Sequence, residues 1–130
     1  SKIAKEVVVP EVRGMKTEDA KKALKDINLE CEVDGSGASI VSMDVYPGYT
    51  VKEGTVIKLN TSGSADDINK VAMPDICGYS KEAAYDMLTK LGISVSFEGE
   101  GTVNSQSISS GEVIVKGTAV KLILESDYKD

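Results

Sequence analysis

The sequence predicts an α+β fold made of two tandem modules, each with one α-helix packed on a three-stranded, mainly antiparallel β-sheet. Three observations support this prediction: an internal repeat, an apolar helical stripe in each copy, and alternating apolar and polar residues after each stripe. The repeat is clearest where residues 7–14, Val-Val-Val-Pro-Glu-Val-Arg-Gly, return at 71–78 as Val-Ala-Met-Pro-Asp-Ile-Cys-Gly, with the two prolines 64 positions apart (74 − 10). The offset falls to 63 after the loop at 36–39, so Gly48 pairs with Gly111.

The repeat divides the 130 residues into module 1 at 5–61, a linker at 62–70 and module 2 at 71–125. A unit of roughly 60 residues buries only about 60% of the surface that its unfolded chain exposes, so each core is small. Contact between the modules is therefore expected to add stability. The linker is small and polar, as flexible linkers are, and its length allows the modules either to fold back on each other or to extend.

Each copy contains one predicted amphipathic helix. Apolar residues recur at i, i+3, i+4 and i+7, which places them on one face of a helix about three turns long. Thr17 and Ser80 are the predicted N-caps, because their hydroxyls can accept from free backbone N–H groups of the first turn. Asn28 and Gly92 follow the stripes and tolerate the left-handed conformation that closes a helix. The stripes are Ala20, Ala23, Leu24 and Ile27, and Ala84, Met87, Leu88 and Leu91.

Strict alternation follows each helix and predicts a strand with one face on the core and the other in water. Pairs of glycines then break the chain before a second strand, and turns at Pro47-Gly48 and Ser110-Gly111 come before the last one. A short extended segment around the proline precedes each helix. The predicted strands are 29–34, 40–45 and 56–61 in module 1, and 93–98, 103–108 and 119–124 in module 2.

Composition excludes several classes of function. The net charge is −6 and the lysines are spread thinly, so the chain lacks the basic footprint of a nucleic-acid-binding protein. No apolar run approaches the ~20 residues of a membrane-spanning helix, so we expect no direct membrane insertion by this chain.

No motif predicts catalysis, a metal site or a cofactor. The chain has no histidine, which removes His-activated nucleophiles and the commonest zinc ligand. Gly35-Ser36-Gly37 lies between two strands and is interpreted as a turn, because a phosphate loop precedes a helix. Ser126 and Lys129 match a Ser-x-x-Lys pattern but lie in the last five residues, where chains fray. We therefore predict no catalytic residue and no enzyme.

Two residue types leave alternatives open. Cys31 and Cys77 occupy non-equivalent positions, which favours two solitary, half-buried thiols over a bridge between the repeats. Arg13, the only arginine, is the one candidate ligand-binding residue, because a guanidinium can hold a ligand carboxylate through two hydrogen bonds. An exposed charge without a ligand is the alternative, and Cys77 replaces it in module 2.

The ordered motifs of both copies resemble the PASTA modules of bacterial penicillin-binding proteins and of membrane-anchored Ser/Thr kinases. The resemblance covers nearly the whole chain. Met43 stands where the family often has the Gln seen at Gln106, and Ser110 replaces the proline seen at Pro47. The motifs are Val9–Met15, Glu18–Ala20, Leu24, Gly35–Gly37, Ile40–Gly48 and Val51–Val56 in module 1, and Met73–Tyr79, Gly99–Val103, Ser105–Ser107, Gly111 and Lys116–Val120 in module 2.

The resemblance implies a location on the outer face of the cytoplasmic membrane, facing the cell wall. It implies that the chain recognises or positions on peptidoglycan, as a non-catalytic accessory region of a transpeptidase. The expected partners are peptidoglycan fragments or the parent transpeptidase domain. The alternatives are the ectodomain of a Ser/Thr kinase that senses muropeptides, and a structural packing module. The Ser-x-Asn and Lys-Thr-Gly motifs of a transpeptidase domain do not occur in this sequence.

Overall fold

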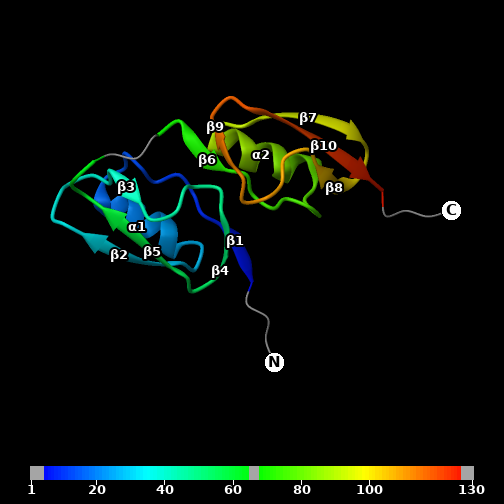
Figure 1. The fold of residues 1–130 in the computed structure, drawn as a ribbon. Coiled ribbons are helices and arrows are strands. Elements are labelled where there is room, and N and C mark those ends of the chain that lie inside the picture. The colour runs from blue at the N-terminus through cyan, green and yellow to red at the C-terminus, as the bar shows by residue number, and fades with distance from the viewer. Residues whose placement is uncertain (1–4, 65–67, 127–130) are drawn as a thin grey trace.

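The computed structural model describes residues 5–64 and 68–126, and shows two modules with the same order of elements (Figure 1). Residues 65–67 of the predicted linker and Asp127–Lys129 of the Ser-x-x-Lys match lie outside the described residues. Within the described ranges, no helix is long and apolar enough to cross a membrane.

Among the described residues, each module contains one helix and five short strands. Module 1 comprises β1 (Glu6–Val8), α1 (Thr17–Lys25), β2 (Glu30–Asp34), β3 (Ser42–Met43), β4 (Thr50–Lys52) and β5 (Val56–Asn60). Module 2 comprises β6 (Lys70–Ala72), α2 (Lys81–Leu91), β7 (Ser94–Gly99), β8 (Thr102–Gln106), β9 (Val113–Val115) and β10 (Ala119–Glu125). The α+β class and the tandem arrangement are confirmed. The second strand of module 1 is shorter than the predicted 40–45.

The three-stranded sheets are more evenly mixed than the mainly antiparallel sheets that we predicted. The last strand of each module lies in the centre of its sheet, parallel to the strand after the helix and antiparallel to the next one, in the orders β2-β5-β3 and β7-β10-β8. The chain reverses twice between β2 and β5, so these two strands run in the same direction. Period-two patterning specifies the buried face of a strand but not which strand inserts between the others.

A second, two-stranded sheet in each module was not predicted. β1 pairs antiparallel with β4, and β6 pairs antiparallel with β9. Each of these strands has three residues, so alternation is too short to identify them. They attach the segment before the proline to the body of the module, and so fix where the proline turn lies.

The two helix starts differ. Ser80 is the N-cap of α2, and its hydroxyl accepts a hydrogen bond from the Ala83 N–H at 3.2 Å, as predicted. The prediction for Thr17 is wrong, because α1 begins at Thr17 itself and Lys16 occupies the N-cap position. The Thr17 hydroxyl instead donates to the Gly37 carbonyl at 3.0 Å, so tertiary bonding replaces the cap.

The predicted end of α2 agrees with the structure, because Gly92 is its C-cap. The predicted end of α1 is wrong, because this helix ends at Lys25 with Asp26 as its C-cap, and Asn28 lies in the turn that follows. Asn28 and Gly92 both have positive φ, at 64° and 81°. Their carbonyls accept hydrogen bonds from Gly54 and Gly117, the glycines of the turn before the last strand. In each module, the turn before the last strand is thus hydrogen-bonded to the chain just after the helix.

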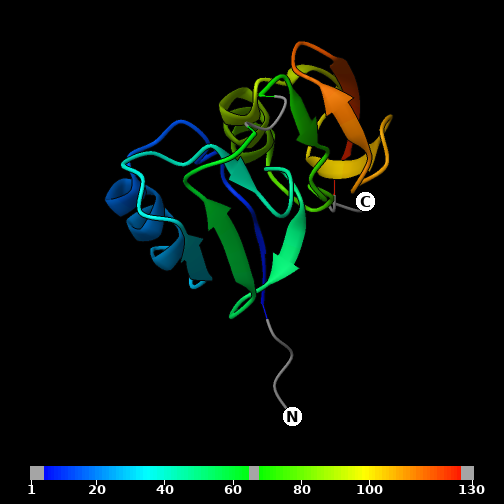
Figure 2. The same ribbon diagram turned by 60° about the vertical axis from the view of Figure 1, so that its left-hand side comes forward.

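The apolar side chains form two clusters that correspond to the modules, with one exception. Helix and sheet residues of module 1, such as Leu24, Ile57 and Leu59, form the first cluster. The second cluster contains residues of module 2, such as Leu88 and Leu122, but also Val8 from β1 of module 1. Figures 1 and 2 show the modules side by side, with β6 next to the loop that follows β3. The two cores are therefore in contact.

Replacing Ser80 with alanine is expected to destabilise module 2 by about 1 kcal/mol, because the first turn of α2 loses the acceptor for the Ala83 N–H. Urea denaturation followed by circular dichroism measures this change. Ser110→Ala, at an exposed turn serine, is the control and should stay within about 0.5 kcal/mol of the parent. Equal effects of the two substitutions would contradict the assigned cap.

Candidate functional site at the junction of the modules

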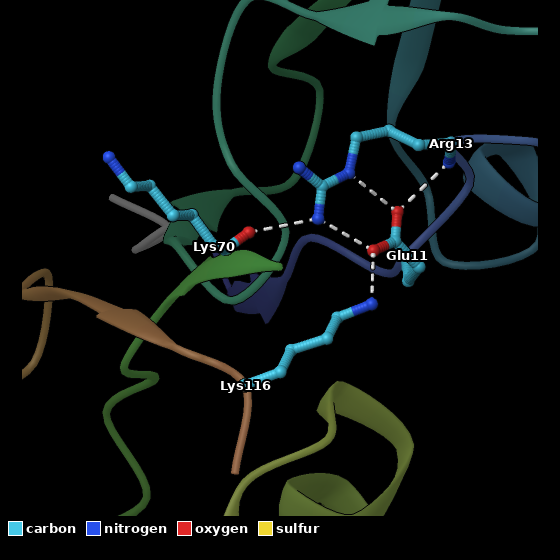
Figure 3. A network of polar contacts seen from close by, with 4 residues as sticks. All are labelled: Glu11, Arg13, Lys70 and Lys116. Atoms are coloured by element: carbon cyan, nitrogen blue, oxygen red, sulfur yellow. Dashed lines mark hydrogen bonds and ion pairs between the residues drawn. The ribbon is translucent and has the colours of Figure 1, made fainter. Parts of the chain in front are cut away.

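Arg13, the one predicted ligand-binding residue, lies at the junction of the two modules with only 2% of its side chain exposed. Its guanidinium forms a two-fold hydrogen-bonded ion pair with Glu11, from Nε to Oε1 at 2.9 Å and from Nη2 to Oε2 at 2.7 Å (Figure 3). The Arg13 backbone N–H also donates to Glu11 Oε1 at 2.9 Å. The turn after the proline therefore holds both side chains in one orientation.

This ion pair extends into module 2. Arg13 Nη2 donates to the Lys70 carbonyl oxygen at 2.9 Å, and Lys116 Nζ lies 3.3 Å from Glu11 Oε2 (Figure 3). The Arg13 guanidinium carbon also lies 5.7 Å from the centre of the Tyr46 ring, in cation–π range. A carboxylate of module 1 is thus shared between an arginine of its own module and a lysine of the other.

Backbone contacts surround this network. The Ala72 N–H donates to the Pro47 carbonyl at 2.8 Å, and the Asp75 N–H donates to Thr50 Oγ1 at 3.1 Å. A Cβ atom at Gly48 would overlap the Ala72 carbonyl oxygen, so the two main chains approach too closely for a side chain at Gly48. The junction is therefore built from main-chain contacts as well as charges.

Module 2 repeats the local turn without the arginine. Asp75 Oδ1 accepts from the Cys77 N–H at 3.3 Å, as Glu11 accepts from Arg13. Cys77 is exposed and has no charge to offer a partner. The ion pair is therefore specific to module 1, as the substitution of Arg13 by Cys77 in the repeat indicated.

The role of Arg13 toward a ligand stays a prediction. The carboxylate that it holds in this structure belongs to Glu11, and the bidentate geometry is the one that we expected for a ligand. The sequence indicated this chemistry but not its partner, although Glu11 stands two residues away. The available signal was an acid and an arginine two residues apart directly after the proline, a combination that module 2 lacks.

The two cysteines are both free thiols, as predicted. Cys31 is partly buried, whereas Cys77 is exposed, so the expectation of burial fails at Cys77. Desolvation and the charge of Asp75 raise the pKa of the Cys77 thiol, which keeps it protonated and weakly nucleophilic at neutral pH. Cys77 Sγ contacts the Asn104 carbonyl and Gln106 Oε1, each at 3.8 Å.

The copy-specific Gln106 has a structural function. Its Nε2 donates to the carbonyl oxygens of Pro74 and Ile108 at 3.1 and 2.8 Å, and its Oε1 accepts from the Ile76 N–H at 3.2 Å. Met43, its counterpart in module 1, is buried in the core. The residue at this position thus forms hydrogen bonds in module 2 and packs in the apolar core in module 1.

A shallow surface hollow lies between α2 and β7 and was missed by sequence reasoning. Tyr85 is 56% exposed there, and Lys81 Nζ lies 5.2 Å from the centre of the Phe97 ring. Glu82 and Asp86 also line the hollow. The available signal was an aromatic residue on the helix outside its apolar stripe. Such a surface offers apolar ring faces beside polar groups, which suits reversible binding.

The described residues contain no group of three or more His, Cys, Asp or Glu side chains placed to hold a metal ion. The hollow at Tyr85 and Phe97 is lined by residues of module 2 alone. Polar groups of the two modules meet at the junction, where Arg13 bonds to the Lys70 carbonyl and Glu11 contacts Lys116.

Replacing Arg13 with methionine is expected to lower the free energy of unfolding by about 3 kcal/mol, the low end for breaking a buried ion pair, because Glu11 keeps Lys116 and partial exposure. Guanidinium denaturation measures the loss. Cys77→Ala changes the equivalent exposed position of module 2 and is expected to cost no more than about 0.5 kcal/mol. An Arg13→Met protein as stable as Cys77→Ala would exclude a structural role for the guanidinium.

The ionisation of Glu11 couples the junction to pH. Desolvation alone would raise the pKa of the Glu11 carboxyl, but hydrogen bonds from Arg13 and the charges of Arg13 and Lys116 oppose it, and the pKa lies below its usual value of 4.5. As pH falls, the unfolded chain takes up this proton first. The stabilisation is therefore complete above pH 4.5 and is lost as the pH falls through the folded-state pKa.

Between pH 4.5 and the folded-state pKa of Glu11, the parent protein is expected to lose stability more steeply than Glu11→Gln. The shift of the Arg13 amide proton, which bonds to Glu11 Oε1, reports the same titration by NMR. Glu98→Gln is the control for the NMR titration: it removes another carboxyl whose pKa is lowered, by Lys121 and away from the junction, and should leave the shift of the Arg13 amide unchanged. Identical pH profiles for the parent and Glu11→Gln would refute the coupling.

The PASTA domain model matches residues 7–63 and 71–126. A probable serine/threonine-protein kinase of Clostridium perfringens is 29% identical over 133 residues, which cover 92% of this chain and 19% of that protein. This chain therefore spans about a fifth of the length of that curated relative.

Solved structures with a similar chain include two larger proteins. Penicillin Binding Protein 2X from Streptococcus thermophilus gives a TM-score of 0.42 at 21% identity, over 94% of this chain and 17% of that one. The extracellular region of the Ser/Thr kinase PrkC from Staphylococcus aureus gives 0.40 at 22% identity, over 95% of this chain and 48% of that one. Since the domain model matches both modules over nearly their whole length, this chain belongs to the PASTA domain family.

Proposed function

We propose that this chain is a non-catalytic, extracytoplasmic binding region that associates with peptidoglycan. The observation that carries the proposal is the tandem match to the PASTA domain, a non-catalytic module of penicillin-binding proteins and kinases. The net charge of −6 argues against anionic polymers such as nucleic acids as ligands.

We assign the ligand to the hollow between α2 and β7. Tyr85 offers a ring face on which the apolar side of a sugar ring can stack, and the carboxylates of Glu82 and Asp86 can accept hydrogen bonds from hydroxyl groups. Phe97 lines the hollow with Lys81 over its ring. The junction is less suited to a ligand, because Arg13 is buried and held by Glu11. Module 1 has Lys21 and Val33 at the positions of Tyr85 and Phe97, so we assign this surface to module 2.

Two parent proteins are compatible with the association. In a penicillin-binding transpeptidase, the region would help place the enzyme at the growing wall. In a Ser/Thr kinase, it would be the ectodomain that senses muropeptides, and the similarity to the probable kinase of Clostridium perfringens favours this second parent. The catalytic domain encoded in the same reading frame distinguishes the two.

Titration of the ¹⁵N-labelled chain with muropeptides, followed by NMR, tests the association. Shifts are expected at millimolar ligand for amides of α2 and β7, because the aromatic hollow lies between them. Tyr85→Ala should weaken the shifts several-fold. Val115→Ala, at a residue 55% exposed on β9, is the matched control and should leave them unchanged. If no amide shifted in the parent protein, a structural packing role would replace the proposed association.

A further inference from the structure

We propose that the two modules form one docked unit of fixed orientation, joined where the β1–β4 end of module 1 meets the β6–β9 end of module 2. This inference concerns the surface between the modules and is independent of any ligand. Three sets of contacts support it: equivalent residues on both sides, a main-chain approach that only glycine permits, and a buried ion pair that crosses the junction.

Equivalent positions of the two modules lie on both sides of the junction. Ala72 is the counterpart of Val8 by the offset of 64, and Gly111 is the counterpart of Gly48 by the offset of 63. Val8 belongs to the core cluster of module 2, while Ala72 contacts Pro47 and Gly48 of module 1. The β1–β4 end of module 1 therefore meets the β6–β9 end of module 2.

The main-chain approach fixes the orientation. The hydrogen bond from the Ala72 N–H to the Pro47 carbonyl is 2.8 Å long, and both atoms belong to the backbone, so no side-chain rotation can absorb a change in angle. A Cβ atom at Gly48 would meet the carbonyl of Ala72, whereas one at Gly111 would come no closer than 3.9 Å to Tyr49. A single methyl group added at Gly48 would therefore push the two modules apart.

The Glu11–Arg13 ion pair adds contacts between the modules beside the main-chain approach. Arg13 bonds to the Lys70 carbonyl, at the first residue of β6, and Lys116 reaches Glu11 from the turn after β9. Lys70 pairs with Val115 in the β6–β9 sheet, so both contacts attach the same end of this sheet to the proline turn of module 1. These bonds resist rotation of module 2 about the Ala72–Pro47 bond.

Residual dipolar couplings of the full chain in a dilute aligning medium test the proposal. In the parent protein, couplings from the two modules should fit one alignment tensor. Gly48→Ala should give two different tensors, while the couplings within each module still fit its own structure. Two different tensors in the parent protein would overturn the proposal.

Gly54→Ala is the matched control. Gly48 and Gly54 have φ of 107° and 89°, so alanine is strained at both, but nothing lies within 4 Å of a Cβ atom at Gly54. The control should keep a single tensor. Retention of one tensor in Gly48→Ala would also refute the proposal.

If Gly48→Ala failed to fold, Lys116→Met would serve as the second variant, because it removes only the Glu11 contact. In this variant the two modules should give different tensors, whereas the parent protein should give one. No change in this variant would refute the role of the ion pair in fixing the orientation.

Discussion

The arrangement of this chain depends on the close approach of two main chains at the module junction. The Ala72 N–H bonds to the Pro47 carbonyl, and Gly48 leaves room for the Ala72 carbonyl beside it. This approach brings Val8 into the core cluster of module 2 and places Arg13 where solvent no longer reaches it. Burial then makes the Glu11–Arg13 pair costly to break, because Arg13 would lose this carboxylate away from solvent, although Glu11 would keep Lys116.

Small size explains why such a contact matters. A module of roughly 60 residues buries a modest fraction of its surface, so apolar area covered by a neighbour contributes noticeably to its stability. The duplicated fold supplies two such modules, and the junction lets one core extend into the other through Val8. Arg13 is thereby held inside the junction, whereas Tyr85 on α2 is 56% exposed.

The sequence predicts the helices, the repeat and most strands, because periodicity and turn residues act locally. It predicts the cap at Ser80 but not the one at α1, since the Thr17 hydroxyl bonds to Gly37, a tertiary partner that spacing does not reveal. The mixed sheet depends on which strand inserts in the centre, and alternation carries no such information. Arg13 was identified as a carboxylate binder, but its partner Glu11 became evident only from the turn geometry.

Hydrogen exchange at the Ala72 amide tests the central claim most directly, because this N–H points out of module 2 and has its bonding partner in module 1. If the modules are docked, the Ala72 amide should exchange orders of magnitude more slowly than an open chain, at a rate close to that of the neighbouring Met73 amide, which bonds to Glu112 within module 2. Fast exchange at Ala72 beside a protected Met73 would show that the modules move independently, and would contradict the account.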